Sequence, residues 1–280
     1  MNTERKHKKS AVGIDLVRLL LAGQGNRIFT TAQARELAPQ VGLKDDYLLE
    51  ALHHLGRDGW IVQLRRGLYA LTAEVPGVAP VHEFEIAMAL VQPAAVSHWS
   101  AMHFHGLTQQ VPRRVYVLTT TAASTPRKRA AGRSHGGEGF SAGGADFTFV
   151  GVDAKRFFGT RQVWIGEARV TVTDAERTLI DGLSKPQFCG DFAEVLQAFK
   201  VRLADLELDR IIDYALRLDG ATPKRLGWVL EHLGLASPHL ERLLSLPVKG
   251  YRTLDPTGER QGPCDGRWMI QVNLPGRIVT

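Results

Sequence analysis

Cysteine is scarce in this chain. Cys189 and Cys264 are the two cysteines in 280 residues, and they stand too far apart in the sequence to form a paired motif. A zinc ribbon and a disulfide framework both need closely spaced pairs, so the sequence argues against both. We therefore expect no metal site and no disulfide, and the cysteine usage fits a reducing cytoplasm.

Long apolar runs are also missing. No stretch approaches the roughly 20 apolar residues that a membrane span needs. The basic start followed by VGIDLVRLLLAG superficially resembles a signal peptide, but Asp15 and Arg18 interrupt the apolar run and no small-residue cleavage site follows. The spacing of the apolar residues instead predicts an amphipathic helix over 12–22 and a soluble, cytoplasmic protein.

Enzyme motifs are absent as well. The sequence contains no phosphate loop, no Gly-x-Ser-x-Gly elbow and no dinucleotide fingerprint. Asp174, Glu176 and Asp181 weakly suggest a nuclease, but the nearest Glu-x-Lys pattern is Glu167-Ala168-Arg169, which lacks the lysine. We predict that the chain is not an enzyme, with no catalytic residues and no cofactor.

The positive charge is concentrated in the first half of the chain. Residues 1–75 hold 11 Lys and Arg against 8 Asp and Glu, and residues 76–145 hold 6 against 3. Residues 146–280 hold 18 of each. This asymmetry suggests that the first half binds a polyanion. The alternative is that a net charge of +6 serves only to keep the protein soluble.

Residues 1–75 predict a winged helix-turn-helix domain with a basic N-terminal arm, ERKHKKS. After the helix over 12–22, Arg27 to Phe29 predicts a strand, and 32–38 predicts a helix capped by Thr30 or Thr31. A third helix is expected from Leu43 or Lys44 to Gly59, followed by a hairpin with Arg65-Arg66-Gly67 at its turn. In this fold the third helix enters the major groove and the hairpin contacts the backbone.

The expected DNA contacts follow from this arrangement. Arg65 and Arg66 suit phosphate, because the guanidinium fork matches phosphate geometry. The other candidates stand at the start of the second helix or on the outward face of the third: Thr31, Lys44, Tyr47, His53, His54 and Arg57. Asp45, Asp46 and Glu50 are unfavourable beside phosphates, and winged helices also dock proteins, so a protein-docking role stays open.

Residues 76–280 predict a larger domain of mixed helices and strands, so the fold class is α+β. A stretch low in apolar residues at about 122–145 predicts a mobile loop, whose PRKRAAGR segment either contacts nucleic acid or is solvated. Thr173 with Glu176 predicts a capping box at the start of a helix. Further helices are expected at 192–202, 208–218, 222–234 and 237–246.

The densest group of unusual side chains is SHWSAMHFHGL, residues 97–107. Helical geometry puts His98 and His105 on one face and His103 far from both, so the three cannot converge on one metal. Neither a His-Glu-x-x-His spacing nor a cysteine accompanies them. We interpret this segment as a scaffold helix capped by Ser97 and ending at Gly106.

Four stretches together resemble the AbiEi family of bacterial antitoxins and transcriptional regulators. They are GWIVQLRRGLYAL, QPAAVSHWSAMHFHGLTQQVPRRVYV, FFGTRQVWIGEARVTVTDAERTLIDGL and YRTLDPTGERQGPCDGRWMIQVNL. The resemblance implies an N-terminal winged helix that binds operator DNA and represses its own operon. It also implies a C-terminal domain that counteracts an AbiEii-type nucleotidyltransferase toxin in a type IV system, a role in phage defence, without a stable toxin complex.

Arg65 and Arg66 are the residues that carry over from the resemblance, as the tip of the wing. The strong match around Thr173, Asp174, Glu176, Arg177 and Asp181 makes these a candidate antitoxin surface. The alternative is a stand-alone winged-helix transcription factor whose C-terminal domain senses a ligand or partner. Self-association on DNA is expected if the operator is an inverted repeat.

Overall fold

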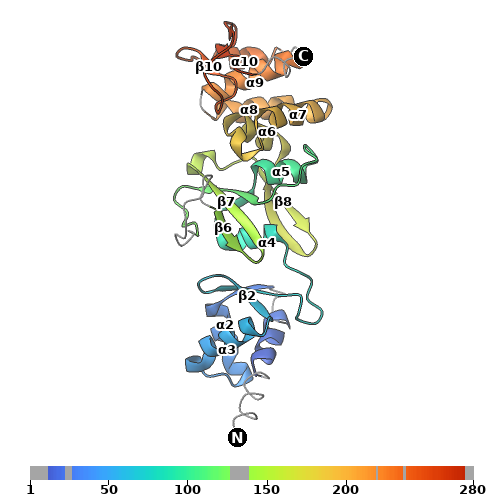
Figure 1. The fold of residues 1–280 in the computed structure, drawn as a ribbon, viewed down its shortest axis with the longest axis vertical. Coiled ribbons are helices and arrows are strands. Elements are labelled where there is room, and N and C mark those ends of the chain that lie inside the picture. Colours follow the sequence, from blue (N-terminus) through green and yellow to red (C-terminus); the bar gives the residue numbers. More distant parts are fainter. Residues whose placement is uncertain (1–11, 23–26, 127–138, 219, 236–237, 275–280) are drawn as a thin grey trace. The chain divides into compact units, whose positions relative to one another are not determined.

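The computed structural model describes residues 12–22, 27–126, 139–218, 220–235 and 238–274 (Figure 1). The expected basic arm and residues 127–138 of the loop predicted at about 122–145 lie outside the described residues. The prediction of a mobile loop is wrong at its C-terminal end, because Gly139–Ala142 form a strand that hydrogen-bonds to the next strand, which begins at Ala145. No helix among the described residues is long and apolar enough to cross a membrane.

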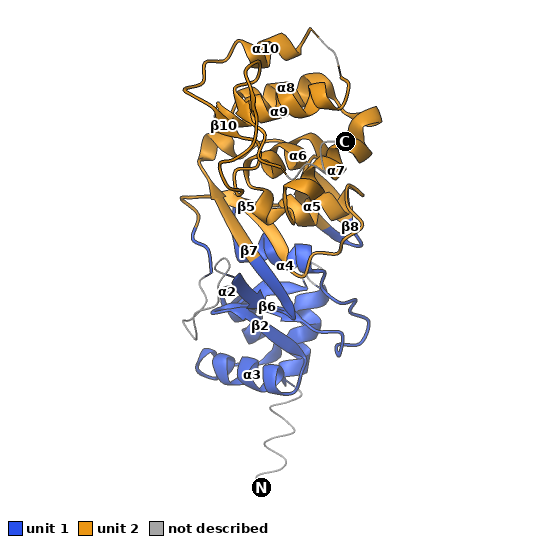
Figure 2. Cartoon of the chain, turned by 45° about the horizontal axis from the view of Figure 1, so that its top comes forward, with its two compact units in different colours: residues 1–92, 124–147, 165–168 blue, residues 93–123, 148–164, 169–280 orange. Residues whose placement is uncertain are grey.

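The chain divides into two compact units, coloured separately in Figure 2. Unit 1 comprises residues 1–92, 124–147 and 165–168, and unit 2 comprises residues 93–123, 148–164 and 169–280. Unit 1 therefore extends beyond the winged helix-turn-helix region expected at 1–75, and two later segments of the chain join it. The domain boundary at residue 75 stays a prediction.

The expected order of elements in the first 75 residues is confirmed. A helix over 12–22 precedes the remaining elements of this region. These are β1 (Ile28–Thr30), α2 (Thr31–Leu37), a 3-10 turn (Ala38–Val41), α3 (Asp45–Arg57), β2 (Ile61–Arg65) and β3 (Leu68–Leu71). The strands form an antiparallel sheet in the order β1-β3-β2.

The core of this region is formed by the apolar faces of its helices. Leu48, Leu52 and Leu55 of α3 are buried, as their spacing on one face predicts. They pack with Leu16 of the helix over 12–22 and with Phe29 of β1. Burial of one face leaves the opposite face of α3 in solvent.

Unit 1 also contains α4 (Glu83–Leu90), which packs against β2. Arg27, at the start of β1, donates to Glu85 of α4 at 2.6 Å, and both side chains are largely buried. Burial raises the pKa of the Glu85 carboxyl, while the Arg27 guanidinium opposes that rise. This ion pair fixes α4 to the winged helix-turn-helix region within the unit.

A six-stranded sheet has the order β6-β7-β5-β4-β9-β8. Its strands are β4 (Ala94–Val96), β5 (Val115–Thr120), β6 (Gly139–Ala142), β7 (Ala145–Val152), β8 (Thr160–Ile165) and β9 (Ala168–Thr173). β4 pairs with β5 antiparallel and with β9 parallel. The mixture of sheet and segregated helices confirms the predicted α+β fold.

The helical part of unit 2 is built around α6 (Ala175–Ser184). It contacts α5 (His98–Phe104), α7 (Phe192–Arg202), α8 (Leu208–Leu216) and α9 (Ala221–His232), and α9 also contacts α10 (Leu240–Leu244). Because neighbours surround α6, almost every residue of it is buried. A small sheet of β10 (Arg252–Thr253), β12 (Ile270–Gln271) and β11 (Cys264–Asp265) follows.

Two expected helix caps differ in the structure. The capping box at Thr173 and Glu176 is wrong: the N-cap is Asp174, whose carboxylate accepts from the Arg177 backbone N–H at 2.7 Å. The Thr173 hydroxyl instead hydrogen-bonds that of Thr178 at 2.8 Å. Ser97 does precede α5, but its hydroxyl pairs with the His98 ring rather than capping the helix.

Candidate nucleic-acid interface

The β2–β3 hairpin presents Arg65 and Arg66 to solvent. Gly67 completes the turn with a φ of 76°, a conformation that glycine adopts without steric cost. The strand register shifts between Gln63 and Arg65. Within the described residues neither arginine side chain has a hydrogen bond or ion pair, so both are available to an anionic partner.

Thr31 lies beside this turn. Its backbone N–H donates to the Gly67 carbonyl at 3.0 Å, which ties the start of α2 to the tip of the hairpin. Thr30, rather than Thr31, caps α2 in a capping box with Gln33. The structure thus places Thr31 beside the turn that carries Arg65 and Arg66.

The outward face of α3 carries the remaining predicted residues. Lys44 is the N-cap, and the solvent side of the helix includes Tyr47, His53, His54 and Arg57. The Tyr47 side chain is 49% exposed. These five residues therefore lie along one element, while Leu48, Leu52 and Leu55 hold that element to the core.

Leu49 is an interface candidate that the sequence reasoning missed. Its side chain is 61% exposed on α3, which is unusual for leucine. Its exposure could have been predicted from the sequence, because Leu49 lies off the face of α3 formed by Leu48, Leu52 and Leu55. An exposed apolar side chain on a recognition helix can contact a thymine methyl group in the major groove.

The carboxylate of Asp45 on α3 is partly neutralised by an arginine of α2. Asp45 accepts from Arg35 of α2 at 2.5 Å, and Glu50 lies 3.6 Å from the His54 ring. Arg57 pairs with Asp58 at 3.1 Å, so its positive charge is already partly engaged. Asp45 is therefore less repulsive toward phosphate than the sequence suggests, and Arg57 is a weaker candidate than Arg65 or Arg66.

This region matches a family model described as "Transcriptional regulator, AbiEi antitoxin" over residues 15–72. Over these residues the chain is similar to the AbiEi family. The matched range runs from the first described helix to the end of the hairpin, and so includes every candidate DNA contact named above. The family is described by regulation and antitoxin activity, not by an enzymatic reaction.

The fold beyond the AbiEi region has a counterpart among solved structures. The chain is similar to a protein from Mycobacterium tuberculosis, titled "Crystal structure of RV2827C protein", with a TM-score of 0.65 and 15% sequence identity. The similarity covers 92% of this chain and 90% of that one. At this identity the comparison supports the fold alone. No curated protein matches the chain.

The residues expected as an antitoxin surface lie outside the AbiEi match and are buried. Their exposed fractions are 0% for Thr173, 9% for Asp174, 1% for Glu176, 1% for Arg177 and 6% for Asp181. They do not form a contact surface in the folded unit, because neighbouring elements cover them. Their assignment to antitoxin activity stays a prediction.

These side chains form polar contacts that join α6 to its surroundings. Arg177 pairs with Asp181 through its Nε at 3.0 Å to each carboxylate oxygen. Asp174 accepts from the Tyr214 hydroxyl at 2.7 Å, and burial together with this bond raises the pKa of Tyr214 to about 12. Glu176 lies 3.3 Å from Arg202. The carboxylates point to different partners, which disfavours a nuclease centre here.

The histidines of residues 97–107 have separate environments. His98 is buried, and its Nδ1 lies 2.8 Å from the Ser97 hydroxyl. His105 places Nε2 2.7 Å from the Thr173 carbonyl, and His103 is exposed. No group of three or more potential metal ligands gathers in the part of the chain that the structure describes.

His98 should make unit 2 sensitive to acid. Burial lowers its pKa to about 4, with smaller effects from Asp181, Lys185 and Arg177. The unfolded chain binds the proton at the usual pKa of about 6.5, so stability is lost as pH falls from about 6.5 to 4. This histidine should account for about 3 kcal/mol of that loss.

The test is urea unfolding of wild type and His98→Asn across this pH range. Asparagine tolerates the positive φ of 50° at this position and does not titrate. The fall in unfolding free energy between pH 6.5 and 4 should be smaller in the variant by about 3 kcal/mol. Parallel curves for the two proteins would show that His98 does not titrate on unfolding.

Proposed function

We propose that the chain is a DNA-binding repressor and antitoxin of a type IV toxin–antitoxin system. In this role it represses its own operon and counteracts an AbiEii-type nucleotidyltransferase toxin. The observation that carries the proposal is the AbiEi match over residues 15–72, on a winged helix whose hairpin exposes Arg65 and Arg66.

On operator DNA, α3 would enter the major groove and the β2–β3 hairpin would contact the adjacent backbone. Arg65, Arg66 and Thr31 then bind phosphate, while Tyr47 and His54, which are seven residues apart and so share one side of α3, face base edges. Lys44, Leu49 and His53 flank them on the same helix. If the operator is an inverted repeat, two copies of the chain bind it, one to each half-site.

The DNA-binding part is tested by fluorescence anisotropy on a duplex from the chain's own promoter. Each phosphate contact contributes about −0.9 to the slope of log K against log salt. Arg65→Ala/Arg66→Ala should therefore make the slope shallower by about two and weaken binding by about tenfold to a hundredfold at physiological salt.

The control is Arg113→Ala/Arg169→Ala, which removes the same charge from exposed positions outside unit 1. It should bind DNA nearly as wild type does, because Arg113 and Arg169 lie outside the region proposed to contact DNA. Since both double variants lose two positive charges, a loss of affinity confined to the wing variant cannot come from net charge alone. If the wing variant retains wild-type affinity at every salt concentration, the wing does not contact DNA.

The antitoxin part is tested by co-expression with a nucleotidyltransferase encoded beside the chain's gene. We expect growth to be restored by wild type and equally by Arg65→Ala/Arg66→Ala, because the wing contacts DNA rather than the toxin. The two proteins should not co-purify. If wild type does not restore growth, the antitoxin role is wrong and the chain is a stand-alone transcription factor. If the two proteins form a stable complex, the type IV assignment is wrong.

A further inference from the structure

Unit 2 contains a pocket of about 200 Å³ where the ends of β5 and β7 meet one face of α6. The strand ends are joined by a hydrogen bond from the Thr121 backbone N–H to the Val152 carbonyl at 2.9 Å. Arg156 follows β7 in a 3-10 turn over Ala154–Arg156, and its side chain also lines the pocket. The pocket therefore has walls from strands, from a helix and from a turn that ends in a cation.

Arg156 is a cation without a partner. The residue is half-buried, its Nε is buried without an acceptor, and within the described residues its side chain makes no hydrogen bond or ion pair. Buried polar groups in native proteins nearly always have a partner, so this guanidinium is a group that a bound molecule would satisfy. Its terminal nitrogens present donors in the planar fork that matches a carboxylate.

The pocket holds Arg156 in place without neutralising it. Arg177 Nη1 donates to the Arg156 carbonyl at 2.8 Å, and Arg177 Nε lies 3.0 Å from each carboxylate oxygen of Asp181. The Arg177–Asp181 pair is neutral overall. Burial lowers the pKa of His98 to about 4, so its ring is uncharged at neutral pH. These three residues shape the pocket but add no net charge to it.

The remaining charges in the lining are those of Asp153, Arg156 and Lys185. Two cations against one carboxylate leave a net charge of +1. In the part of the chain that the structure describes, neither Asp153 nor Lys185 forms an ion pair. Lys185 is the C-cap of α6, where its charge also balances the partial negative charge of the helix end. Arg156 is therefore the main binding group for an anion.

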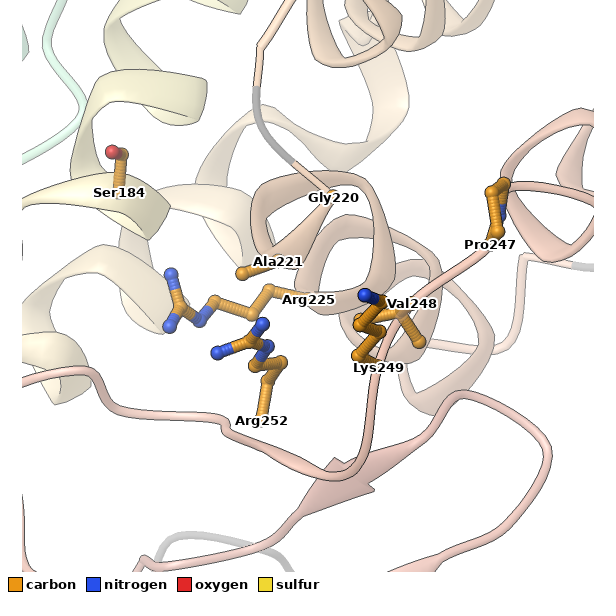
Figure 3. Close-up of a pocket in the computed structure, with 8 residues that line it drawn as sticks. All are labelled: Ser184, Gly220, Ala221, Arg225, Pro247, Val248, Lys249 and Arg252. Atoms are coloured by element: carbon orange, nitrogen blue, oxygen red, sulfur yellow. The ribbon is translucent and has the colours of Figure 1, made fainter.

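A larger pocket of about 520 Å³ in the same unit lacks such a group among the contacts that the structure gives for its arginine (Figure 3). Its lining includes Arg225 of α9, which donates to the carbonyls of Thr253 at 3.0 Å and Leu183 at 3.3 Å. The Arg225 guanidinium is thus bound by the protein itself, whereas the Arg156 side chain has no acceptor among the described residues. The smaller pocket is the better candidate for a ligand site.

We propose that the smaller pocket binds a small organic acid through its carboxylate. The Arg156 fork binds the carboxylate through paired hydrogen bonds, and Lys185 adds a point charge. Leu118, Val150 and Leu218 provide an apolar wall for the aliphatic part of the ligand. The volume is below the roughly 300–1,000 Å³ of sites for drug-sized molecules, so the ligand has few heavy atoms. One carboxylate also matches the net charge of +1.

The test is isothermal titration of the full chain with acetate, propionate, butyrate and inorganic phosphate. Arg156→Gln should weaken carboxylate binding at least about tenfold, because it removes hydrogen bonds between charged groups. Arg156→Lys keeps the charge without the fork and should bind with intermediate affinity. Thermal unfolding without ligand should be unchanged in both variants, because the Arg156 side chain has no partner to lose among the described residues.

Lys155→Gln is the matched control. Lys155 is the neighbour of Arg156 in the same 3-10 turn, but it is exposed and does not line the pocket. This variant should bind carboxylates as wild type does. Asp153→Asn should instead tighten binding about two- to fivefold, because it removes a negative charge that repels the ligand.

The probes also separate a carboxylate from other anions. Tighter binding of propionate or butyrate than of acetate supports an organic acid whose aliphatic part contacts the apolar wall. The proposal is overturned if wild type binds none of the carboxylates, or if phosphate binds more tightly than all of them. It is also overturned if Arg156→Gln binds as well as wild type, or if Lys155→Gln loses as much affinity as Arg156→Gln.

Discussion

Asp181→Asn is expected to lower the free energy of unfolding of unit 2 by about 3–5 kcal/mol. Arg177 and Asp181 are one turn apart on α6, and their side chains are 1% and 8% exposed. The Arg177 Nη2 and Nε atoms both lie 3.0 Å from Asp181 oxygens. Removing the carboxylate charge leaves a guanidinium buried without its ionic partner.

The other contacts of Arg177 do not compensate for this loss. Its Nη1 donates to the carbonyls of Arg156 at 2.8 Å and Phe158 at 3.2 Å, and its guanidinium lies 4.3 Å from the Phe158 ring centre. These groups are neutral dipoles or a π face, so they orient the cation without cancelling its charge. Arginine also stays protonated at any accessible pH.

Asp213→Asn is the matched control, because Asp213 pairs with Arg242 at 2.6 Å while both side chains are about half exposed. Exposed pairs contribute about 0–1 kcal/mol, so this variant should be nearly neutral. Urea unfolding followed by tryptophan fluorescence is suitable, since four of the five tryptophans belong to unit 2. If both variants lose a similar unfolding free energy, burial of the Arg177–Asp181 pair does not determine its contribution to stability.

A double variant tests whether the loss comes from the unpaired charge. Arg177→Met/Asp181→Leu replaces the pair by apolar side chains, which is often close to neutral for a buried ion pair. It should therefore be more stable than Asp181→Asn alone. If it is less stable, the hydrogen bonds of Arg177 to Arg156 and Phe158 contribute more than the ion pair.

Helices with a local signal could be predicted from the sequence. The helix over 12–22, α3 and α7 have apolar residues at helical spacing, and each was located to within about two residues. The β2–β3 hairpin could also be predicted from the sequence, because two strand-like runs flank Arg65-Arg66-Gly67. Such signals depend on neighbours in the sequence, which is why they need no knowledge of the tertiary fold.

The cap of α6 depended on residues far away in the sequence. Thr173 and Asp174 are adjacent, and either can cap a helix. The Thr173 hydroxyl also lies 3.3 Å from the carbonyl of Val96 in β4, at the parallel pairing of β4 with β9. That sheet contact engages Thr173 and leaves Asp174 as the cap, which no local pattern could reveal.

The burial of the charged residues of α6 could not be predicted from the sequence. A charged side chain is normally assigned to solvent, so Glu176, Arg177 and Asp181 were expected on a surface. Helices α7 and α8 cover α6 and bring Arg202 and Arg210 to within 3.3 and 3.7 Å of Glu176.

Gly227→Ala is expected to destabilise unit 2 by about 3–5 kcal/mol, comparable to deletion of a buried tryptophan. A Cβ at this position of α9 would lie 1.9 Å from Cζ3 and 2.2 Å from Cη2 of Trp268. Trp268 is fully buried, and its indole N–H donates to Glu231. The ring must therefore leave its site, and the gain of up to about 1 kcal/mol in helix propensity cannot offset this.

Gly56→Ala makes the same change in α3, where the nearest atoms to the new Cβ are those of Ile61 at 3.9 Å or more. It should stabilise unit 1 by about 0.5–1 kcal/mol, because alanine loses less backbone entropy in a helix. In Gly227→Ala/Trp268→Leu the two losses should not add, since the smaller side chain removes the clash. Additive losses would mean that the glycine is required for a reason other than its contact with Trp268.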